Sequence, residues 1–151
     1  RLHAMFLYRT PESINQKFSQ KKEISSTVFQ VENWLLHHGT KLEKRFSLPA
    51  YKLMNHLLKT IDITKNSDDF VSQISDISAS IHLVAIDSDL LFTAHETKNS
   101  YANLKEIKSN IFYHEIQSIH GHDAFLIEYE QLSTILKPIF QTQSQLNYVS
   151  I

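Results

Sequence analysis

Residues 81–86 read IHLVAI and residues 111–116 read IFYHEI, and these two segments decide the fold. Both are short apolar runs rich in β-branched and aromatic residues, which is typical of buried parallel strands. Between them, Thr93 and Glu96 form a capping-box pattern that predicts a helix running to about Lys105. Two strands joined by a helix predict a parallel pair, because a parallel connection has to cross back over the sheet.

A final helix is predicted after the second strand, capped by Asp123 and interrupted by Pro138. It completes a βαβα unit, so the predicted fold class is α/β, helix-rich over the whole chain. Two parallel strands cannot form a stable sheet alone, because both faces and both edges need cover. We therefore expect the remaining strands to lie elsewhere. Arg1, where an initiator Met would stand, also suggests part of a longer protein.

The first half of the chain is predicted to be helical, because its apolar residues recur at three- and four-residue spacing. The predicted boundaries are a start at Thr10-Pro11, a helix from Thr27 to His38 that Gly39 ends, a start at Ser47, and a cap at residues 66–69. The chain thus divides into a helical region over 1–79, an α/β region over 80–140, and a polar tail over 141–151.

Composition is that of an ordinary globular domain, with 42% hydrophobic and 21% charged residues. A formal net charge of -1 gives no basic excess that would attract nucleic acid. No apolar run approaches the roughly 20 residues that a membrane-spanning helix needs. The chain has no cysteine, which excludes disulfides and thiolate zinc sites and fits a reducing compartment. We expect a cytoplasmic protein that binds neither nucleic acid nor membrane.

Polar side chains follow both predicted strands. Asp87 and Asp89 come directly after the first strand, and His120, His122 and Asp123 come shortly after the second. Ligands gather at the carboxyl ends of parallel strands, and an acid preceding a histidine is the order found in Ser-His-acid triads of α/β-hydrolases. Two other interpretations stay open, in which a strand-end Asp only forms a turn or the two histidines and Asp123 bind a metal. We predict no metal, and the pattern does not choose between Asp87 and Asp89.

Three segments carry a resemblance to a known family. Residues 121–126 (GHDAFL) resemble the segment that homoserine O-acetyltransferases place around their catalytic histidine. Residues 86–92 (IDSDLLF) are similar to the family's acid-bearing strand end, and the interval between the two motifs is typical. Residues 1–12 (RLHAMFLYRTPE) resemble the segment that enters the family's helical lid. The resemblance covers most of residues 1–140.

The resemblance implies the C-terminal portion of an α/β-hydrolase fold, with residues 1–79 as the helical lid. It implies that His122 is the general base and that Asp89, rather than Asp87, orients it. It also implies substrate binding by Asp123, which would meet the ammonium group of homoserine, and by Arg1, which would pair with the carboxylate. Tyr8 would line the same pocket.

The implied reaction is a ping-pong transfer of an acetyl group from acetyl-CoA to the hydroxyl of L-homoserine, in methionine biosynthesis. Acetyl-CoA would be a co-substrate, and no cofactor would be bound permanently. The implied partners are the N-terminal half of the same enzyme and a second copy of the protein, forming a homodimer through the lid.

Departures from the family pattern limit these expectations. Thr93 replaces a frequent Pro, and Ser47-Leu48-Pro49 replaces the usual Asp-Ala-Asn. The chain has only two glycines, too far apart for the G-x-S-x-G nucleophile elbow, so we expect it to be inactive alone. Two alternatives stay open. One is another acyltransferase or esterase, such as a homoserine O-succinyltransferase or serine O-acetyltransferase, and the other is a non-catalytic stand-alone module.

Overall fold

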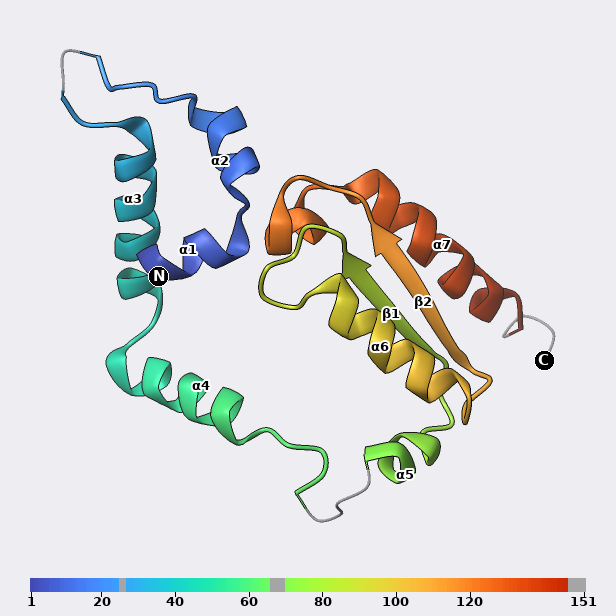
Figure 1. Cartoon of the computed structure of the whole chain (residues 1–151). Helices are drawn as coiled ribbons and strands as arrows, with labels where there is room; N and C mark the ends of the chain where they lie inside the picture. The colour runs from blue at the N-terminus through green and yellow to red at the C-terminus, as the bar shows by residue number, and fades with distance from the viewer. Residues whose placement is uncertain (25–26, 66–69, 147–151) are drawn as a thin grey trace.

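The computed structural model describes residues 1–24, 27–65 and 70–146, with side chains as far as Gln141. Its elements are, in order, α1 (Leu2–Tyr8), α2 (Pro11–Phe18), α3 (Gln30–Arg45), α4 (Leu48–Thr60), α5 (Phe70–Ser75), β1 (Ile81–Ile86), α6 (Ala94–Lys105), β2 (Ile111–Ile116), the 3₁₀ helix η1 (Gly121–Leu126) and α7 (Tyr129–Leu146). The chain is helix-rich around one two-stranded sheet (Figure 1). No helix in the described ranges is both long and apolar enough to cross a membrane.

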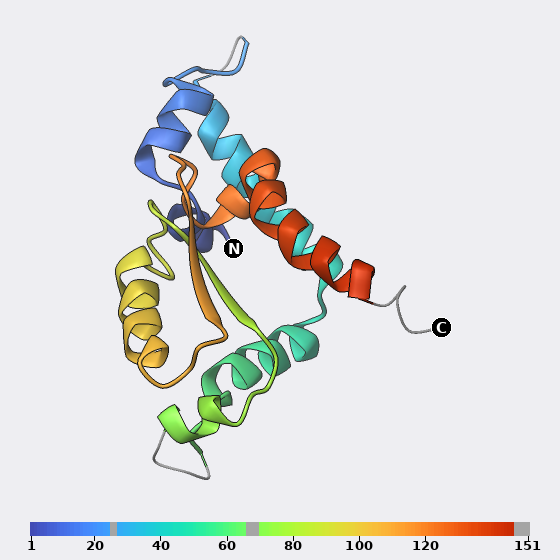
Figure 2. The same ribbon diagram turned by 90° about the vertical axis from the view of Figure 1, so that its right-hand side faces the viewer.

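The two predicted strands are confirmed and pair in parallel, in a register that aligns Ile81 with Ile111 and Ile86 with Ile116. Helix α6 covers one face of this pair and α7 the other (Figures 1 and 2). The core between the sheet, η1 and α7 consists of Ile86, Ile116 and Ala124, against which Val84, Leu132 and Ile135 pack. The carboxyl ends of both strands therefore lie directly beside η1.

Three helices begin where the sequence predicts them. The Thr10 hydroxyl accepts a hydrogen bond from the Ser13 N–H at 3.0 Å, and the Ser47 hydroxyl caps α4 in the same way. The Thr93 hydroxyl accepts from the Glu96 N–H at 3.3 Å and donates to the Glu96 carboxylate at 2.9 Å. These side chains satisfy N–H groups that the first helical turn leaves unpaired, so local sequence is enough to set these boundaries.

The predicted end of α3 at Gly39 is wrong. The helix begins at Gln30 and continues through Gly39 to Arg45. A Cβ atom placed on Gly39 would lie 2.8 Å from Cδ1 of Leu2, which comes from α1. The glycine therefore allows two helices to approach closely, a long-range reason that a pattern based on neighbouring residues does not contain.

The last helix also differs from the prediction. Residues 121–126 form the 3₁₀ helix, so Asp123 lies inside that turn and does not cap α7, which begins at Tyr129. Helix α7 passes through Pro138 and reaches Leu146, beyond the expected start of a polar tail at Gln141. Proline removes one N–H from the helix ladder, but α7 is anchored on the sheet by residues that precede it.

Helix α4 carries the apolar row that its sequence predicts, and this row is exposed. Its members are Tyr51, Met54, Leu57, Leu58 and Ile61. Contiguous exposed apolar side chains of this kind commonly mark surfaces that another protein, or another part of the same protein, covers. The next helix, α5, begins at Phe70, and the cap predicted at residues 66–69 lies outside the described residues.

Candidate active site

The loops that follow β1 and β2 are bonded to each other. The Asp87 carboxylate accepts a hydrogen bond from the Ser118 N–H at 2.9 Å. The Ser88 hydroxyl donates to the Ser118 carbonyl and accepts from the Gly121 N–H, the latter at 3.1 Å. Asp87 and Ser88 therefore fix the relative position of the two loops, and Asp87 acts as the strand-end turn residue.

Asp89 and His122 form a hydrogen-bonded pair across these loops. Oδ2 of Asp89 lies 2.8 Å from Nδ1 of His122. Oδ1 of the same carboxylate accepts from the backbone N–H groups of Leu91 and Phe92, at 2.7 and 3.0 Å. Asp89 is only 7% exposed, so its carboxylate is fixed on both sides. A carboxylate can only accept, so this contact assigns a proton to Nδ1 of His122 and leaves Nε2 as an acceptor.

Aromatic rings surround the His122 imidazole. The ring centroids of Tyr8, Phe92 and Phe125 lie 5.4, 5.5 and 5.8 Å from that of His122. A cavity of about 350 Å³ lies next to the pair, and both Asp89 and His122 line it. The His122 side chain keeps 24% of its surface exposed. The imidazole is thus held in an apolar environment with one edge open, which suits a general base.

Tyr8 lies next to this pair, and Arg1 lies over the Tyr8 ring. The Arg1 guanidinium lies 5.0 Å from the centroid of the Tyr8 ring, which is the ring that packs against His122. Arg1 also lines a hollow that includes His38 and Lys41, and burial together with the charge of Arg1 lowers the pKa of His38. The structure therefore brings Arg1, Tyr8, Asp89 and His122 into one chain of contacts.

Asp123 is paired with Arg9, a residue that the sequence did not single out. Nε of Arg9 lies 2.9 Å from Oδ2 of Asp123, and both side chains are less than one-fifth exposed. The two residues are 114 positions apart, so no local pattern could have indicated the pair. Phe92 and Phe125 lie inside the motifs quoted above, but their contact with His122 was not predicted either.

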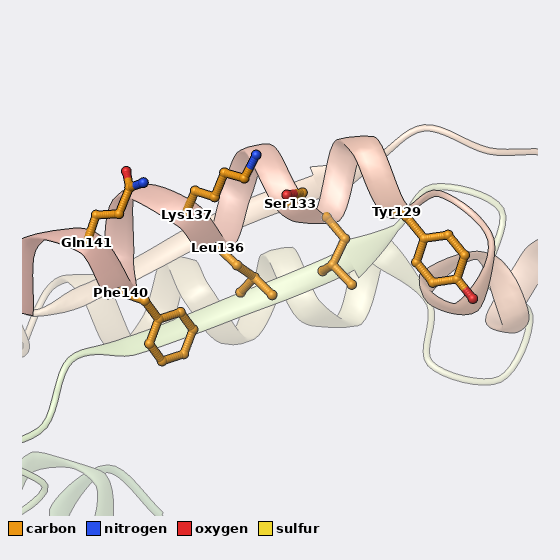
Figure 3. Close-up of a pocket in the computed structure, with 7 residues that line it drawn as sticks. Tyr129, Ser133, Leu136, Lys137, Phe140 and Gln141 are labelled. Atoms are coloured by element: carbon orange, nitrogen blue, oxygen red, sulfur yellow. The ribbon is translucent and has the colours of Figure 1, made fainter. Parts of the chain in front are cut away.

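Two other features of the described residues, a hollow along α7 and a pair of histidines on the sheet, show no such acid–base pair. A hollow along α7 is lined by Leu136 and Phe140 on its β1 side and by Lys137 on the outer side, with no carboxylate or imidazole (Figure 3). Nδ1 of His82, on β1, lies 3.0 Å from Nε2 of His114, on the neighbouring strand β2. Burial, and after it the charge of His82, lowers the pKa of His114. Across residues 1–24, 27–65 and 70–146, no group of three or more potential ligands could hold a metal ion.

Several known proteins similar to this chain share one name. A homoserine O-acetyltransferase of Methanococcus vannielii is 39% identical over an alignment of 139 residues that covers 85% of this chain. Proteins of the same name from Cyclobacterium marinum and Chloroherpeton thalassium are 35% and 34% identical and cover 90% and 95% of it. This chain is homologous to homoserine O-acetyltransferases. It spans 27%, 37% and 36% of the length of these three relatives. No family model matches it.

Gly121, in the loop that resembles the catalytic loop of homoserine O-acetyltransferases, has a backbone that other residues rarely adopt. Its φ is +67°, and an added Cβ would lie 3.1 Å from the Tyr8 carbonyl oxygen and 3.3 Å from the Thr10 nitrogen. We expect Gly121→Ala to lower the free energy of unfolding of the complete protein by roughly 1–3 kcal/mol. Denaturant unfolding followed by circular dichroism measures this change.

Gly39→Ala is the matched control, because the atom that its Cβ would meet is the movable end of the Leu2 side chain. Alanine is also favoured over glycine inside a helix by about 1 kcal/mol, which offsets part of the contact. Gly121→Asn separates the two causes, since asparagine tolerates positive φ but still carries a Cβ. An unchanged unfolding midpoint for Gly121→Ala would contradict the tight packing of the loop against residues 8–10.

Proposed function

We propose that the complete protein containing this chain is a homoserine O-acetyltransferase, and that the chain supplies its general base. The observation that carries this proposal is the 2.8 Å contact between His122 and Asp89 at the carboxyl ends of β1 and β2. It occurs in a chain whose relatives are named for that activity. The residues that surround the pair also match the family motifs on which the resemblance rests.

In the proposed first half-reaction, Nε2 of His122 takes the proton of a nucleophilic serine. The serine oxygen attacks the thioester carbonyl of acetyl-CoA, the C–S bond breaks, and the departing sulfur receives the proton. In the second half-reaction, Nε2 takes the proton of the homoserine hydroxyl, whose oxygen attacks the acetyl-serine ester. The serine oxygen then leaves and receives that proton. Asp89 holds the imidazole in the required tautomer and stabilises its charged form.

The serine and the oxyanion hole would come from the part of the protein outside this chain. The chain has no G-x-S-x-G sequence, in which the nucleophile of such enzymes sits on a sharp strand-to-helix turn. The two-stranded sheet would then be part of a larger parallel sheet of an α/β-hydrolase fold, of which this chain forms the C-terminal portion.

Substrate recognition is assigned to the charged residues beside the pair. Asp123 follows His122 directly and would bind the homoserine ammonium group. Arg1 would bind the carboxylate, because a guanidinium can form two parallel hydrogen bonds with it. The contact between Arg1 and Tyr8 and that between Tyr8 and His122 support a pocket that joins the two ends of the substrate.

The remaining proposals concern the lid, the dimer, the co-substrate and the cellular compartment. We propose that residues 1–79 are the helical lid and that the complete protein dimerises through it. The exposed apolar row of α4 supports this arrangement. Acetyl-CoA acts as a co-substrate with no permanently bound cofactor, and the enzyme works in the cytoplasm in methionine biosynthesis.

The test is an assay of the complete protein with acetyl-CoA or succinyl-CoA as donor and L-homoserine or L-serine as acceptor, followed by release of the CoA thiol. We expect the acetyl-CoA and homoserine pair to give the highest kcat/KM, and the 151-residue chain alone to give no turnover. Preference for serine or succinyl-CoA would move the protein to a different acyltransferase. Turnover by the chain alone would contradict the assignment of the nucleophile to another part of the protein.

A further inference from the structure

The turn between α1 and α2 is bonded to the loop that carries His122. Arg9, Thr10 and Ser13 lie on one side, and Ile119, His120 and Asp123 lie on the other; we call these six residues the junction cluster. The Thr10 hydroxyl donates to the Ile119 carbonyl, and Oγ of Ser13 lies 2.8 Å from Nδ1 of His120. The Arg9–Asp123 ion pair closes the cluster. Two segments more than 100 positions apart are thus joined by side-chain bonds.

Arg9 makes two contacts that fix its orientation. Nε bonds Oδ2 of Asp123 at 2.9 Å, and Nη1 donates to Oγ of Ser13 at 3.4 Å. Ser13 is 4% exposed and is itself bonded to His120, so it is a fixed anchor for the guanidinium. A lysine has a single nitrogen in place of this rigid fork and could not hold both partners in the same geometry.

Asp123 is held through one carboxylate oxygen. Oδ2 receives the Arg9 bond, and no partner for Oδ1 is found among the side chains and backbone that the structure describes. Asp123 is also the residue next to His122, whose Nε2 is the proposed proton acceptor. The orientation of the Asp123 carboxylate therefore sets where a cationic group bound to Oδ1 would lie relative to Nε2.

We infer that Arg9 is a positioning residue for acceptor recognition: it locks Asp123 through Oδ2 so that Oδ1 faces the ammonium group of the acyl acceptor. This inference rests on the proposed function. An ammonium group held at a fixed place brings the acceptor hydroxyl to Nε2 of His122. A displaced Asp123 carboxylate would lose part of its charged hydrogen bond to that ammonium group, which weakens binding of the acceptor. The donor, acetyl-CoA, is not expected to contact Asp123, so Arg9 acts on the second half-reaction alone.

The direction of the change in homoserine binding distinguishes a positioning role of Arg9 from a purely electrostatic one. Arg9 carries a positive charge that weakens the pull of Asp123 on another cation. If charge were its only role, Arg9→Gln would strengthen homoserine binding and Arg9→Lys would behave as the wild type. If Arg9 positions Asp123, both variants weaken binding, because neither can bond Asp123 and Ser13 together in the original geometry.

The experiment measures kcat and KM for each substrate in the complete protein, together with CoA release from acetyl-CoA alone. We expect Arg9→Gln and Arg9→Lys to raise the KM for homoserine by roughly 10- to 100-fold, the effect of weakening a hydrogen bond to a charged group. We expect kcat to change much less, and CoA release in the absence of acceptor to stay within about twofold. Lys17→Gln is the matched control, since Lys17 is a basic residue of α2 that lies over the rings of Phe18 and Trp34 instead of the junction cluster.

A second acceptor makes the test specific. 4-Hydroxybutyrate lacks the amino group of homoserine, so it has nothing to place on Asp123. We expect the Arg9 variants to use it as well as the wild type does, and we expect Arg9→Gln to have no further effect in an Asp123→Asn background. A merely structural role for Arg9 would slow both acceptors equally.

Each outcome decides the matter. An unchanged or lower KM for homoserine in both variants, with an active wild type, overturns the inference and leaves the proposed function intact. A wild type that does not acetylate homoserine overturns both. If Arg9→Gln fails to fold, as shown by its circular dichroism spectrum, Arg9→Lys provides the same comparison. Equal loss with 4-hydroxybutyrate in any of these variants counts against positioning.

Discussion

His122→Ala in the complete protein is expected to lower kcat for acetyl transfer by about 10⁴-fold or more. Among the residues that the structure describes, the His122 imidazole alone combines a fixed carboxylate partner with an open ring nitrogen in the described cavity. Its loss removes the proton acceptor from both half-reactions, so acetyl-CoA alone should also fail to give a burst of CoA. Stopped-flow detection of the thiol measures the burst, and steady-state assays measure kcat.

His95→Ala is the control, because His95 is an exposed residue of α6 whose ring bonds Asn99. We expect its kcat to stay within about twofold of the wild type, as is usual for a surface change away from the site. Added imidazole should restore part of the activity of His122→Ala by occupying the space that the side chain leaves. A kcat within tenfold of the wild type for His122→Ala would remove the basis of the proposed function.

Asp89→Asn is expected to lower kcat by roughly 10³- to 10⁴-fold while leaving the fold intact. Oδ1 of Asp89 accepts from the N–H groups of Leu91 and Phe92, so the carbonyl oxygen of an asparagine would take that place. Its NH₂ group would then face Nδ1 of His122, which would have to accept. The imidazole proton would move to Nε2, the atom that must be free to take the proton of the nucleophile. Steady-state kinetics and a circular dichroism spectrum test this prediction together.

Asp87→Asn is the matched control for this change. Asp87 accepts from the Ser118 N–H, and an asparagine oxygen can accept the same bond at the same place. We expect at most about a tenfold loss of kcat, since Asp87 orients a loop and does not contact His122. If Asp87→Asn lost as much activity as Asp89→Asn, the assignment of the acid to Asp89 would have to be reversed.

The two strands and the starts of α2, α4 and α6 were predictable because their signals are local. Thr10, Ser47 and Thr93 cap helices with their own side chains, and the apolar runs of β1 and β2 form the predicted parallel pair, in which Ala85, Ile86, Ile111 and Ile116 are buried. The ends of α3 and α7 were not predictable. Gly39 lies inside α3, where Leu2 of another helix packs closely against it. Pro138 lies in α7, which Leu132 and Ile135 already anchor on the core.

The candidate site was likewise predictable in its local features and not in its long-range contacts. Strand-end position singled out the acids and histidines, and the resemblance selected Asp89, which is the acid that contacts His122. Neither pattern nor resemblance indicated that Asp123 pairs with Arg9, because that contact depends on how the α1–α2 turn packs against η1. Local sequence and the resemblance identified the paired Asp89 and His122, whereas the contacts that support them depend on tertiary structure.

The long separation within the junction cluster has a consequence for synthesis on the ribosome. Ser13 precedes His120 by 107 positions, which at about 5–20 residues per second corresponds to a delay of roughly 5–20 s. The α1–α2 turn has therefore left the ribosome long before its partner loop exists. The turn therefore cannot form its side-chain bonds to Ile119, His120 and Asp123 until the last part of this chain has been synthesised.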